Sequence, residues 1–388
     1  MMGRSSPQPP VSLLDPVGQY KRLKPVIDAR IATVLGHGRF VNGPEVAELE
    51  TALAARSGAK HVVAVANGTD ALNIALRTER IGPGDAVFVP AFSFVATGGA
   101  VALNGATPIF VDIDPRTFVM DPSVLADTIR HVRSAGDLVP RAVMPVDLFG
   151  LPADYGRLEP LCREEGLFLL VDGAQSFGAS QHGRRVGAFG DATITSFFPS
   201  KPLGAWGDGG AMFTDDRARM EQWRVVCAHG TSGDPYDAQR IGTNSRLDTL
   251  QAAVLLAKLP GYQDEIARRN VIADAYTEAL RDLAEIPVVP DGNVSVWAQY
   301  SLLVDRRDAV RAALTERGIP TRVYYPRTLP AQMAFRGSAR LGLPCPAAAD
   351  ITTRVVNLPM HSELDDLMVA RVIAALRDVL RHRPGTQR

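Results

Sequence analysis

The stretch Ala192-Thr193-Ile194-Thr195-Ser196-Phe197-Phe198-Pro199-Ser200-Lys201-Pro202-Leu203-Gly204 constrains the fold of this chain more than any other. Its first residues are apolar and β-branched, which is typical of a buried strand, and its last residues are those of a turn. Lys201 therefore follows directly after a predicted strand. Because clefts in α/β proteins open at the carboxyl ends of their strands, its amine is a candidate for imine formation with a carbonyl compound. The competing interpretation is an ordinary solvated lysine.

A second strand end carries the residues of an anion site. Asn67-Gly68-Thr69-Asp70 follows the apolar run 61–66 and precedes a helical pattern. Free backbone N–H groups and the helix dipole point outward together at such a turn, and the Thr69 hydroxyl can add a hydrogen bond. Simple capping of the helix by Thr69 or Asp70 explains the same residues without a ligand.

Two further strand ends carry a carboxylate and an aromatic ring. Asp172 ends the apolar run 167–171, where a carboxylate is costly to bury unless a cation or a proton meets it. A helix cap or a structural ion pair is the alternative for Asp172. Phe94 follows the predicted strand 85–90 and is either a core residue or a ring that stacks on a flat ligand.

The order of the predicted elements indicates two domains, a large one of the α/β type and a smaller one of the α+β type. Strands alternate with helices as far as about residue 215, which predicts a mostly parallel sheet. A long helical pattern from 249 to 283, broken near Pro260, is interpreted as a linker helix. We then expect a strand, a helix, a strand and a helix at 294–304, 307–317, 320–325 and 364–380. The predicted division is a flexible tail at 1–10, a large domain at 11–248, and the linker helix with a small α+β domain at 249–388.

The composition excludes several classes of protein. Lys+Arg and Asp+Glu both number 42 in 388 residues, so no net charge attracts nucleic acid or a membrane surface. The three cysteines are scattered without a CxxC spacing, which argues against a disulfide framework or a metal site and favours a reducing, cytoplasmic compartment. No apolar run approaches the roughly 18 residues of a membrane span, and residues 1–10 show no signal-peptide pattern.

One cofactor requires all four features that follow the strand ends. Pyridoxal 5′-phosphate carries a phosphate, a flat ring, a pyridine nitrogen that works best when protonated, and an aldehyde that forms an imine with lysine. A carboxylate beside the ring nitrogen would keep it protonated and so has a physical reason to be buried. The sequence therefore predicts a pyridoxal-phosphate enzyme.

The chain also resembles a known family over nearly its whole length, roughly residues 12–380. That family is the DegT/DnrJ/EryC1/StrS family of pyridoxal-phosphate-dependent sugar aminotransferases. The resemblance rests on motifs that occur in order: Gly43-Pro44-Glu45-Val46, Asn67-Gly68-Thr69-Asp70-Ala71-Leu72, Pro90-Ala91-Phe92-Ser93-Phe94-Val95-Ala96-Thr97, Gly105-Ala106-Thr107-Pro108, Asp172-Gly173-Ala174-Gln175-Ser176, Ser196-Phe197-Phe198-Pro199-Ser200-Lys201, Gly207-Asp208-Gly209-Gly210, Asn244-Ser245-Arg246-Leu247-Asp248 and Trp297-Ala298-Gln299-Tyr300. It implies the type I, aspartate aminotransferase-like fold, with a large parallel-sheet domain and a smaller C-terminal α+β domain.

The resemblance implies roles for the residues around the cofactor ring. Lys201 would hold pyridoxal phosphate as an imine and then move protons, and Asp172 would pair with the pyridine nitrogen. Gln175 would donate a hydrogen bond to the ring oxygen, and Phe94 would stack on the ring face. Lys201 and Asp172 are thus the predicted catalytic residues, and no metal is expected.

The resemblance also implies phosphate and substrate contacts. The phosphate would be held by Gly68, Thr69, Asp70, Ser196 and Asn244, with Asn244 coming from the second subunit of a homodimer whose active sites lie at the interface. Arg246 would face the substrate, where a bidentate guanidinium suits a carboxylate of the amino donor or of the sugar. Tyr325 is either a further substrate contact or a packing residue.

The implied reaction is a ping-pong transfer of an amino group from an amino acid, expected to be glutamate, to a keto-sugar nucleotide. The most similar subgroup aminates C3 of a UDP-3-keto-N-acetylglucosaminuronic acid, in amino-sugar biosynthesis for a surface polysaccharide or a glycosylated natural product. A C4-specific enzyme, or one acting on dTDP- or GDP-keto sugars, is the alternative. Two positions depart from the family pattern: Gly173 stands where alanine is common, and Pro330 where relatives often have histidine.

Three other functions compete with this hypothesis. A nicotinamide dehydrogenase would need a GxGxxG motif after its first strand, and none is present there. A sugar dehydratase related to the family has histidine in place of the lysine, which Lys201 contradicts. A non-catalytic protein of the same fold that binds a sugar nucleotide is the distant alternative, and the intact Lys201 and Asp172 argue against it.

Overall fold

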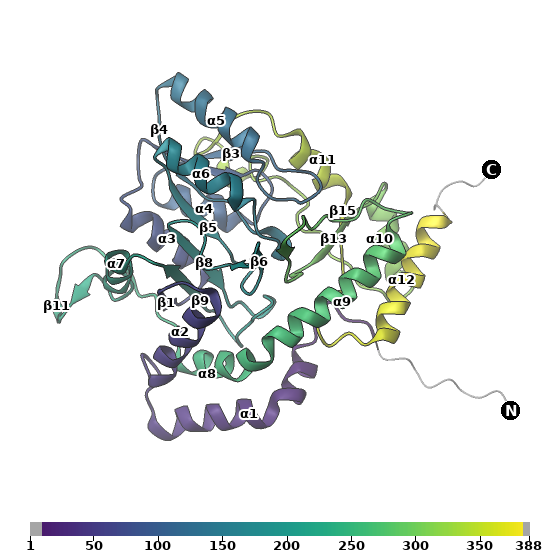
Figure 1. Ribbon diagram of the computed structural model, residues 1–388, viewed down its shortest axis with the longest axis horizontal. Helices are drawn as coiled ribbons and strands as arrows, with labels where there is room; N and C mark the ends of the chain where they lie inside the picture. Colours follow the sequence, from purple (N-terminus) through teal and green to yellow (C-terminus); the bar gives the residue numbers. More distant parts are fainter. Residues whose placement is uncertain (1–9, 383–388) are drawn as a thin grey trace.

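A mostly parallel sheet forms the centre of the computed structural model, which describes residues 10–382 (Figure 1). Within these residues the sheet has eight strands in the order β1-β9-β8-β5-β4-β2-β3-β14, and only β9 runs antiparallel to its neighbours. The strands are β1 (His61–Val65), β2 (Asp85–Pro90), β3 (Thr107–Val111), β4 (Val139–Val143), β5 (Phe168–Asp172), β8 (Ala192–Ser196), β9 (Gly210–Thr214) and β14 (Arg340–Leu341). The predicted α/β class is confirmed, and the predicted tail lies outside the described residues except for Pro10.

Helices cover the large sheet on both sides, and smaller elements complete this part of the chain (Figure 1). The helices are α1 (Pro16–His37), α2 (Pro44–Ser57), α3 (Gly68–Thr78), α4 (Val95–Leu103), α5 (Pro122–Ala135), η1 (Leu148–Gly150), α6 (Tyr155–Glu165), α7 (Arg217–Cys227) and α8 (Thr249–Lys258). The small strand β6 (Ser180–Gln181) pairs with β7 (Arg184–Arg185) on one side and with β12 (Asn293–Val294) on the other. A second small sheet is formed by β10 (Thr231–Ser232) and β11 (Asp234–Ala238).

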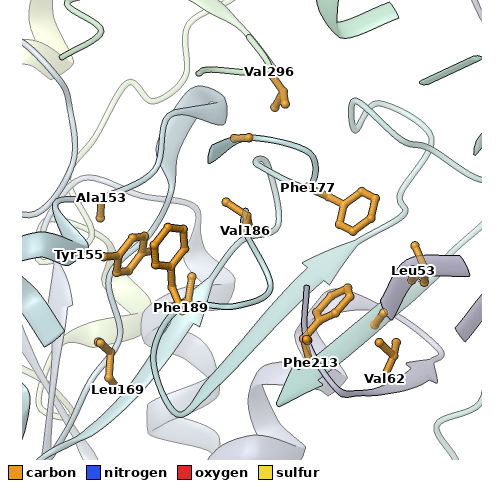
Figure 2. Close-up of a cluster of buried hydrophobic side chains, with 14 of the residues drawn as sticks. Leu53, Val62, Ala153, Tyr155, Leu169, Phe177, Val186, Phe189, Phe213 and Val296 are labelled. Atoms are coloured by element: carbon orange, nitrogen blue, oxygen red, sulfur yellow. The ribbon is translucent and has the colours of Figure 1, made fainter. Parts of the chain in front are cut away.

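The strands are buried on both faces, as expected for a parallel sheet between two helical layers. In β2, Phe88 belongs to one apolar cluster while Val87 and Val89 belong to the other. Figure 2 shows part of the first cluster, in which the rings of Tyr155 and Phe189 stack with centroids 4.3 Å apart. This packing holds the strand ends, and the polar residues that follow them, in fixed positions.

A third apolar cluster lies away from the large sheet, in the C-terminal part of the chain (Figure 1). The cluster is formed by α9 (Tyr262–Leu280), β13 (Tyr300–Leu303), α10 (Arg307–Glu316), β15 (Val355–Leu358) and α12 (Asp366–Arg381). The other elements of this part, η2 (Leu259–Gly261), η3 (Met333–Phe335) and α11 (Pro346–Arg354), place their buried side chains in the two clusters of the large sheet. The separate cluster supports the predicted small domain. Helix α8, however, packs on α1 and α2, so we propose that the division falls after α8 rather than before it.

Two predicted strands of the small domain are wrong. The segment 294–304 is not one strand, because Trp297 has a left-handed φ of 47° and separates β12 from β13. The segment 320–325 is not a strand either, apart from a bridge between Arg322 and Asn357. Its ladder is interrupted because the Tyr324 N–H donates instead to the Asn357 side chain, at 2.7 Å.

Between Pro10 and His382 no helix combines the length and the apolar composition that crossing a bilayer requires.

Candidate active site

A cavity of about 490 Å³ opens where the strand ends of the large sheet meet the small domain. The ends of β2, β5 and β8 and the starts of α3 and α4 all contribute to its wall. Of the residues singled out from the sequence, the lining includes Gly68, Thr69, Phe94, Asp172, Gln175, Ser196, Lys201 and Tyr325. The convergence follows from topology, because the carboxyl ends of parallel strands lie at one edge of a sheet.

Lys201 and Asp172 both line this cavity, and each charge affects the pKa of the other group. Burial lowers the pKa of the Lys201 amine, and the negative charge of Asp172 opposes that shift. Burial likewise raises the pKa of Asp172, opposed by its hydrogen bonds and by the positive charge of Lys201. A lysine whose pKa is lowered supplies more of the neutral amine, which is the form that attacks a carbonyl carbon or accepts a proton.

The Asp172 carboxylate is held by donors that the sequence analysis had not assigned. The Thr97 hydroxyl donates to Oδ2 at 2.9 Å, and the Ala174 N–H donates to Oδ1 at 3.3 Å. Thr97 in turn shares a hydrogen bond of 2.9 Å with the Ser93 hydroxyl. Both hydroxyls lie in the segment that supplies Phe94, four residues apart, which is the spacing of neighbours on a helix face. That spacing was the available signal for them.

A second buried carboxylate, Asp147, lies outside the cavity lining and was also missed in the sequence analysis. It accepts hydrogen bonds from the Tyr155 hydroxyl, from the Ser176 hydroxyl at 2.7 Å and from the Ala153 N–H at 2.9 Å. Burial raises the pKa of Asp147 to about 6 despite these donors. Its backbone N–H donates to the Asp172 carbonyl at 3.1 Å, so the network fixes the loop that carries Asp172.

Gln175 is oriented so that its amide N–H₂ faces the cavity. The Gln175 Oε1 accepts from the Phe149 N–H at 2.7 Å, so Nε2, with two N–H groups, is the donor that faces the Tyr325 hydroxyl. Nε2 lies 3.3 Å from the Tyr325 hydroxyl, and burial raises the pKa of Tyr325, so this phenol keeps its proton. The rings of Tyr325 and Phe94 lie 6.1 Å apart at 38°. A donor beside two aromatic rings suits a flat ligand that carries an oxygen.

The start of α3 forms a cradle of the kind that holds a phosphate. A Cβ on Gly68 would lie 2.9 Å from the Ser196 Cβ, so only glycine lets the turn approach β8 this closely. The helix is capped by Asn67, whose Oδ1 accepts from the Asp70 N–H at 2.8 Å. Neither Thr69 nor Asp70 is the capping residue. The Thr69 hydroxyl is therefore not used for capping, whereas Asp70 does not line the cavity. The Asn67 cap leaves backbone N–H groups of the first turn for an anion.

Three other residues from the sequence analysis lie outside this cavity. Asn244 is exposed, and Arg246 lines a separate cavity of about 310 Å³ near Arg224 and Cys227. Pro330, which replaces a histidine common in relatives, does not line the cavity either. Among the additional lining residues are Asp208, Gln299 and Tyr324, which come from loops with no periodicity to mark them.

The donor set fits pyridoxal phosphate. The cavity joins a phosphate cradle, aromatic rings, a buried carboxylate and a lysine with a lowered pKa. Throughout residues 10–382, no three His, Cys, Asp or Glu side chains are grouped so that they could hold a metal ion. In a complex with pyridoxal phosphate, Gly68, Thr69 and Ser196 would hold the phosphate, Phe94 would lie against the ring, Asp172 would meet the ring nitrogen and Lys201 would meet the aldehyde carbon.

Comparisons with known proteins agree with this site. Residues 22–377 match the DegT/DnrJ/EryC1/StrS aminotransferase family. The UDP-2-acetamido-2-deoxy-3-oxo-D-glucuronate aminotransferase of Pseudomonas aeruginosa is 43% identical over 370 residues, which are 94% of this chain and 99% of that protein. The UDP-N-acetyl-3-dehydro-alpha-D-glucosamine 3-aminotransferase of Acidithiobacillus ferrooxidans is 38% identical, over 95% of this chain and 98% of that one. The crystal structure of a DegT DnrJ EryC1 StrS aminotransferase from Brucella abortus superposes with a TM-score of 0.93, at 44% identity, covering 95% of this chain and 99% of that one.

The fold and the site thus define a pyridoxal-phosphate-dependent transferase of fold type I, as the sequence analysis predicted. The chain belongs to the DegT/DnrJ/EryC1/StrS aminotransferase family, and it is an aminotransferase of the amino-sugar pathways in which that family acts.

Proposed function

We propose that this enzyme transfers the amino group of L-glutamate to C3 of a UDP-linked 3-keto-N-acetylglucosaminuronic acid, yielding 2-oxoglutarate and the 3-amino sugar. The proposal of transferase chemistry rests on one observation. Lys201 and Asp172 interact electrostatically and line the same cavity as the Gly68 cradle. The substrate is inferred from the relative named for a 3-oxo-glucuronate, which matches the chain almost from end to end. We further propose a cytoplasmic location, since the three cysteines are free thiols and suit a reducing compartment.

The chain's own residues account for the proton movements of such a reaction. When bound, pyridoxal phosphate supplies an electrophilic carbon and a ring that withdraws electrons. Burial favours the neutral amine of Lys201, which then accepts the proton from Cα of glutamate in the first half-reaction. In the second half-reaction the same amine delivers a proton to C3 of the sugar. Asp172 stays ionised when it pairs with the cationic ring nitrogen, and Thr97 keeps its carboxylate oriented.

The substrate assignment is tested in the reverse direction, where the amino sugars are stable. Purified enzyme with pyridoxal phosphate and 2-oxoglutarate is given the UDP-3-amino uronic acid, the matching UDP-3-amino sugar without the carboxylate, or a dTDP-4-amino sugar. We expect kcat/KM for glutamate formation to be highest for the 3-amino uronic acid, by at least about 10-fold, because a site built for a polar group rejects substrates that lack it. A preference for the 4-amino sugar would contradict C3 amination.

We also propose a homodimer in which each subunit completes the other's site. Two aromatic rings that line the Lys201 cavity, Phe94 and Phe198, are 53% and 50% exposed. Exposed apolar groups at a cavity mouth favour a covering partner. Asn244 and Arg246 do not reach the cavity of their own chain, so a second copy is the proposed route by which they contact the phosphate and the substrate.

Subunit complementation tests this arrangement. Lys201→Ala and Asn244→Ala are co-expressed with different affinity tags, and the mixed dimer is purified through both tags. Each parent homodimer should have little activity, whereas the mixed dimer should have one intact site in two and about half of wild-type activity. A mixed dimer no more active than the average of its parents would show that Asn244 does not act across the interface.

A further inference from the structure

A second cavity, here called the annex, adjoins the Lys201 cavity and belongs to no function assigned so far. It has a volume of about 330 Å³ and shares Ser200, Gln299 and Tyr324 with the Lys201 cavity. Its remaining wall comes from the N-terminal segment and the small domain, namely Leu13, Leu14, Ala298, Arg322, Asn357, Leu358 and Met360. At about 30 Å³ per water molecule the annex holds about ten waters, which is enough room for a polar group of a substrate.

Arg322 gives the annex its charge. It is the only charged residue among the ten that line the annex, so no carboxylate of the wall neutralises it. Within residues 10–382 its guanidinium has no hydrogen-bond or ion-pair partner, unlike that of Arg354, which pairs with Glu285 and Asp350. A guanidinium has five N–H donors in a planar fork that matches a carboxylate in a bidentate pair. The annex therefore offers an unpaired site for an anion.

The backbone of Arg322 is fixed by a buried asparagine. The Arg322 N–H donates to the Asn357 carbonyl at 3.1 Å, and the Asn357 N–H donates back to the Arg322 carbonyl at 2.9 Å. The Asn357 side chain is anchored in turn, accepting from the Tyr324 N–H at 2.7 Å and donating to the Ser301 hydroxyl at 2.6 Å. Asn357 is 1% exposed and belongs to β15, so Arg322 and Tyr324 are presented from a rigid support.

Gln299 lines both cavities. Its Oε1 is buried and has no hydrogen-bond partner among the described residues. A buried acceptor without a partner destabilises the protein, so a ligand that donates to it is favoured. A ligand with a hydroxyl or an amine close to a carboxylate would satisfy Gln299 and Arg322 together. Sugar acids and amino acids both have this pattern.

We propose that the annex is the carboxylate subsite of the enzyme and that Arg322 is the residue that binds the carboxylate there. Two sources carry this group: the α-carboxylate of the amino donor and the C6 carboxylate of the sugar. The sugar source rests on the proposed function, whereas the donor source requires only an aminotransferase. Arg246, the residue that the family resemblance assigns to a carboxylate, lines another cavity of the chain.

The experiment compares Arg322→Ala and Arg322→Lys with the wild-type holoenzyme. UDP-glucuronic acid and UDP-glucose differ only in the C6 carboxylate, and their affinities are measured by titration calorimetry. The glutamate half-reaction is followed separately, through the loss of the cofactor's visible absorption after rapid mixing. Arg327→Ala is the matched control, because Arg327 lies in the same segment and is exposed, as Arg322 is, but lines neither cavity.

The expected loss on Arg322→Ala is about 10- to 100-fold, the value of hydrogen bonds to a charged group. A loss confined to UDP-glucuronic acid, with UDP-glucose unchanged, assigns the subsite to the sugar carboxylate. A loss confined to kcat/KM of the glutamate half-reaction assigns it to the donor. Arg322→Lys should recover only part of either loss, because an ammonium lacks the bidentate fork.

Two results would overturn the proposal. One is that Arg322→Ala changes neither the affinity for UDP-glucuronic acid nor the glutamate half-reaction by more than about 2-fold, the usual scatter of surface substitutions. The other is an equal loss for UDP-glucuronic acid and UDP-glucose with no effect on glutamate, which would indicate damage unrelated to the carboxylate. If the wild type binds neither nucleotide sugar, the proposed substrate is wrong, and the glutamate measurement alone still decides the role of Arg322.

Discussion

Replacing Lys201 by alanine is expected to lower turnover by about 10⁴-fold or more, because one amine both binds the cofactor covalently and moves the protons. Burial lowers the pKa of Lys201, and it is the one lysine among the described residues that line the cavity. The measurement is the rate of 2-oxoglutarate formation from glutamate and the keto sugar, with pyridoxal phosphate in excess.

The fold should survive this substitution, since alanine removes a buried cation and adds no volume. Thermal unfolding followed by circular dichroism checks that point. Lys60→Ala is the matched control, because the Lys60 side chain is 70% exposed and pairs only with Asp215, at 3.7 Å. Turnover of Lys201→Ala within about 10-fold of the wild type would exclude Lys201 as the proton carrier.

Replacing Asp172 by asparagine is expected to lower turnover by at least about 100-fold, the scale of removing one preorganised electrostatic contact from an active site. The amide has nearly the shape of the carboxylate, so its Oδ1 can still accept from the Ala174 N–H while its Nδ2 donates to the Thr97 hydroxyl. What is lost is the negative charge that keeps the ring nitrogen protonated. Saturating pyridoxal phosphate should not restore activity, which separates this role from cofactor binding.

Asp147→Asn provides the comparison for Asp172. Asp147 is also a fully buried carboxylate, but it does not line the cavity and contacts Tyr155, Ser176 and Ala153 instead. Its substitution should cost less than about 10-fold in turnover, because only the positioning of a loop is affected. Equal losses in the two variants would mean that Asp172 acts through burial of its charge and not through the cofactor ring.

The strand ends of the site could be predicted because one physical rule covers them. Lys201 and Asp172 each follow an apolar run, and β5 and β8 pair in parallel, so their carboxyl ends lie side by side. Local sequence identifies each strand end, and the topology of a parallel sheet brings them together. For that reason the cavity contains both residues, together with Phe94 and Gly68.

Contacts between distant segments left no such local signal. Thr97 donates to Asp172, 75 positions away, and Asp147 accepts from Ser176, 29 positions away. The spacing of Ser93 and Thr97 does not show which carboxylate they meet, and no neighbour of Asp147 marks it as part of the site. The two-residue strand β14 joins β3 from more than two hundred positions along the chain. The failure of the predicted strand at 320–325 has the same origin, because the Asn357 side chain takes the backbone donor that a ladder would need.

The central claim, that Lys201 carries the cofactor and starts amino transfer, is tested most directly by the absorption spectrum of the purified protein. After addition of pyridoxal phosphate and removal of the excess, the wild type should retain a visible absorption band that Lys201→Ala lacks. Glutamate alone should remove the band, and a keto-sugar nucleotide should restore it. A wild-type protein that retains no band, or a band that glutamate leaves unchanged, would contradict the assignment of Lys201 and with it the transferase mechanism.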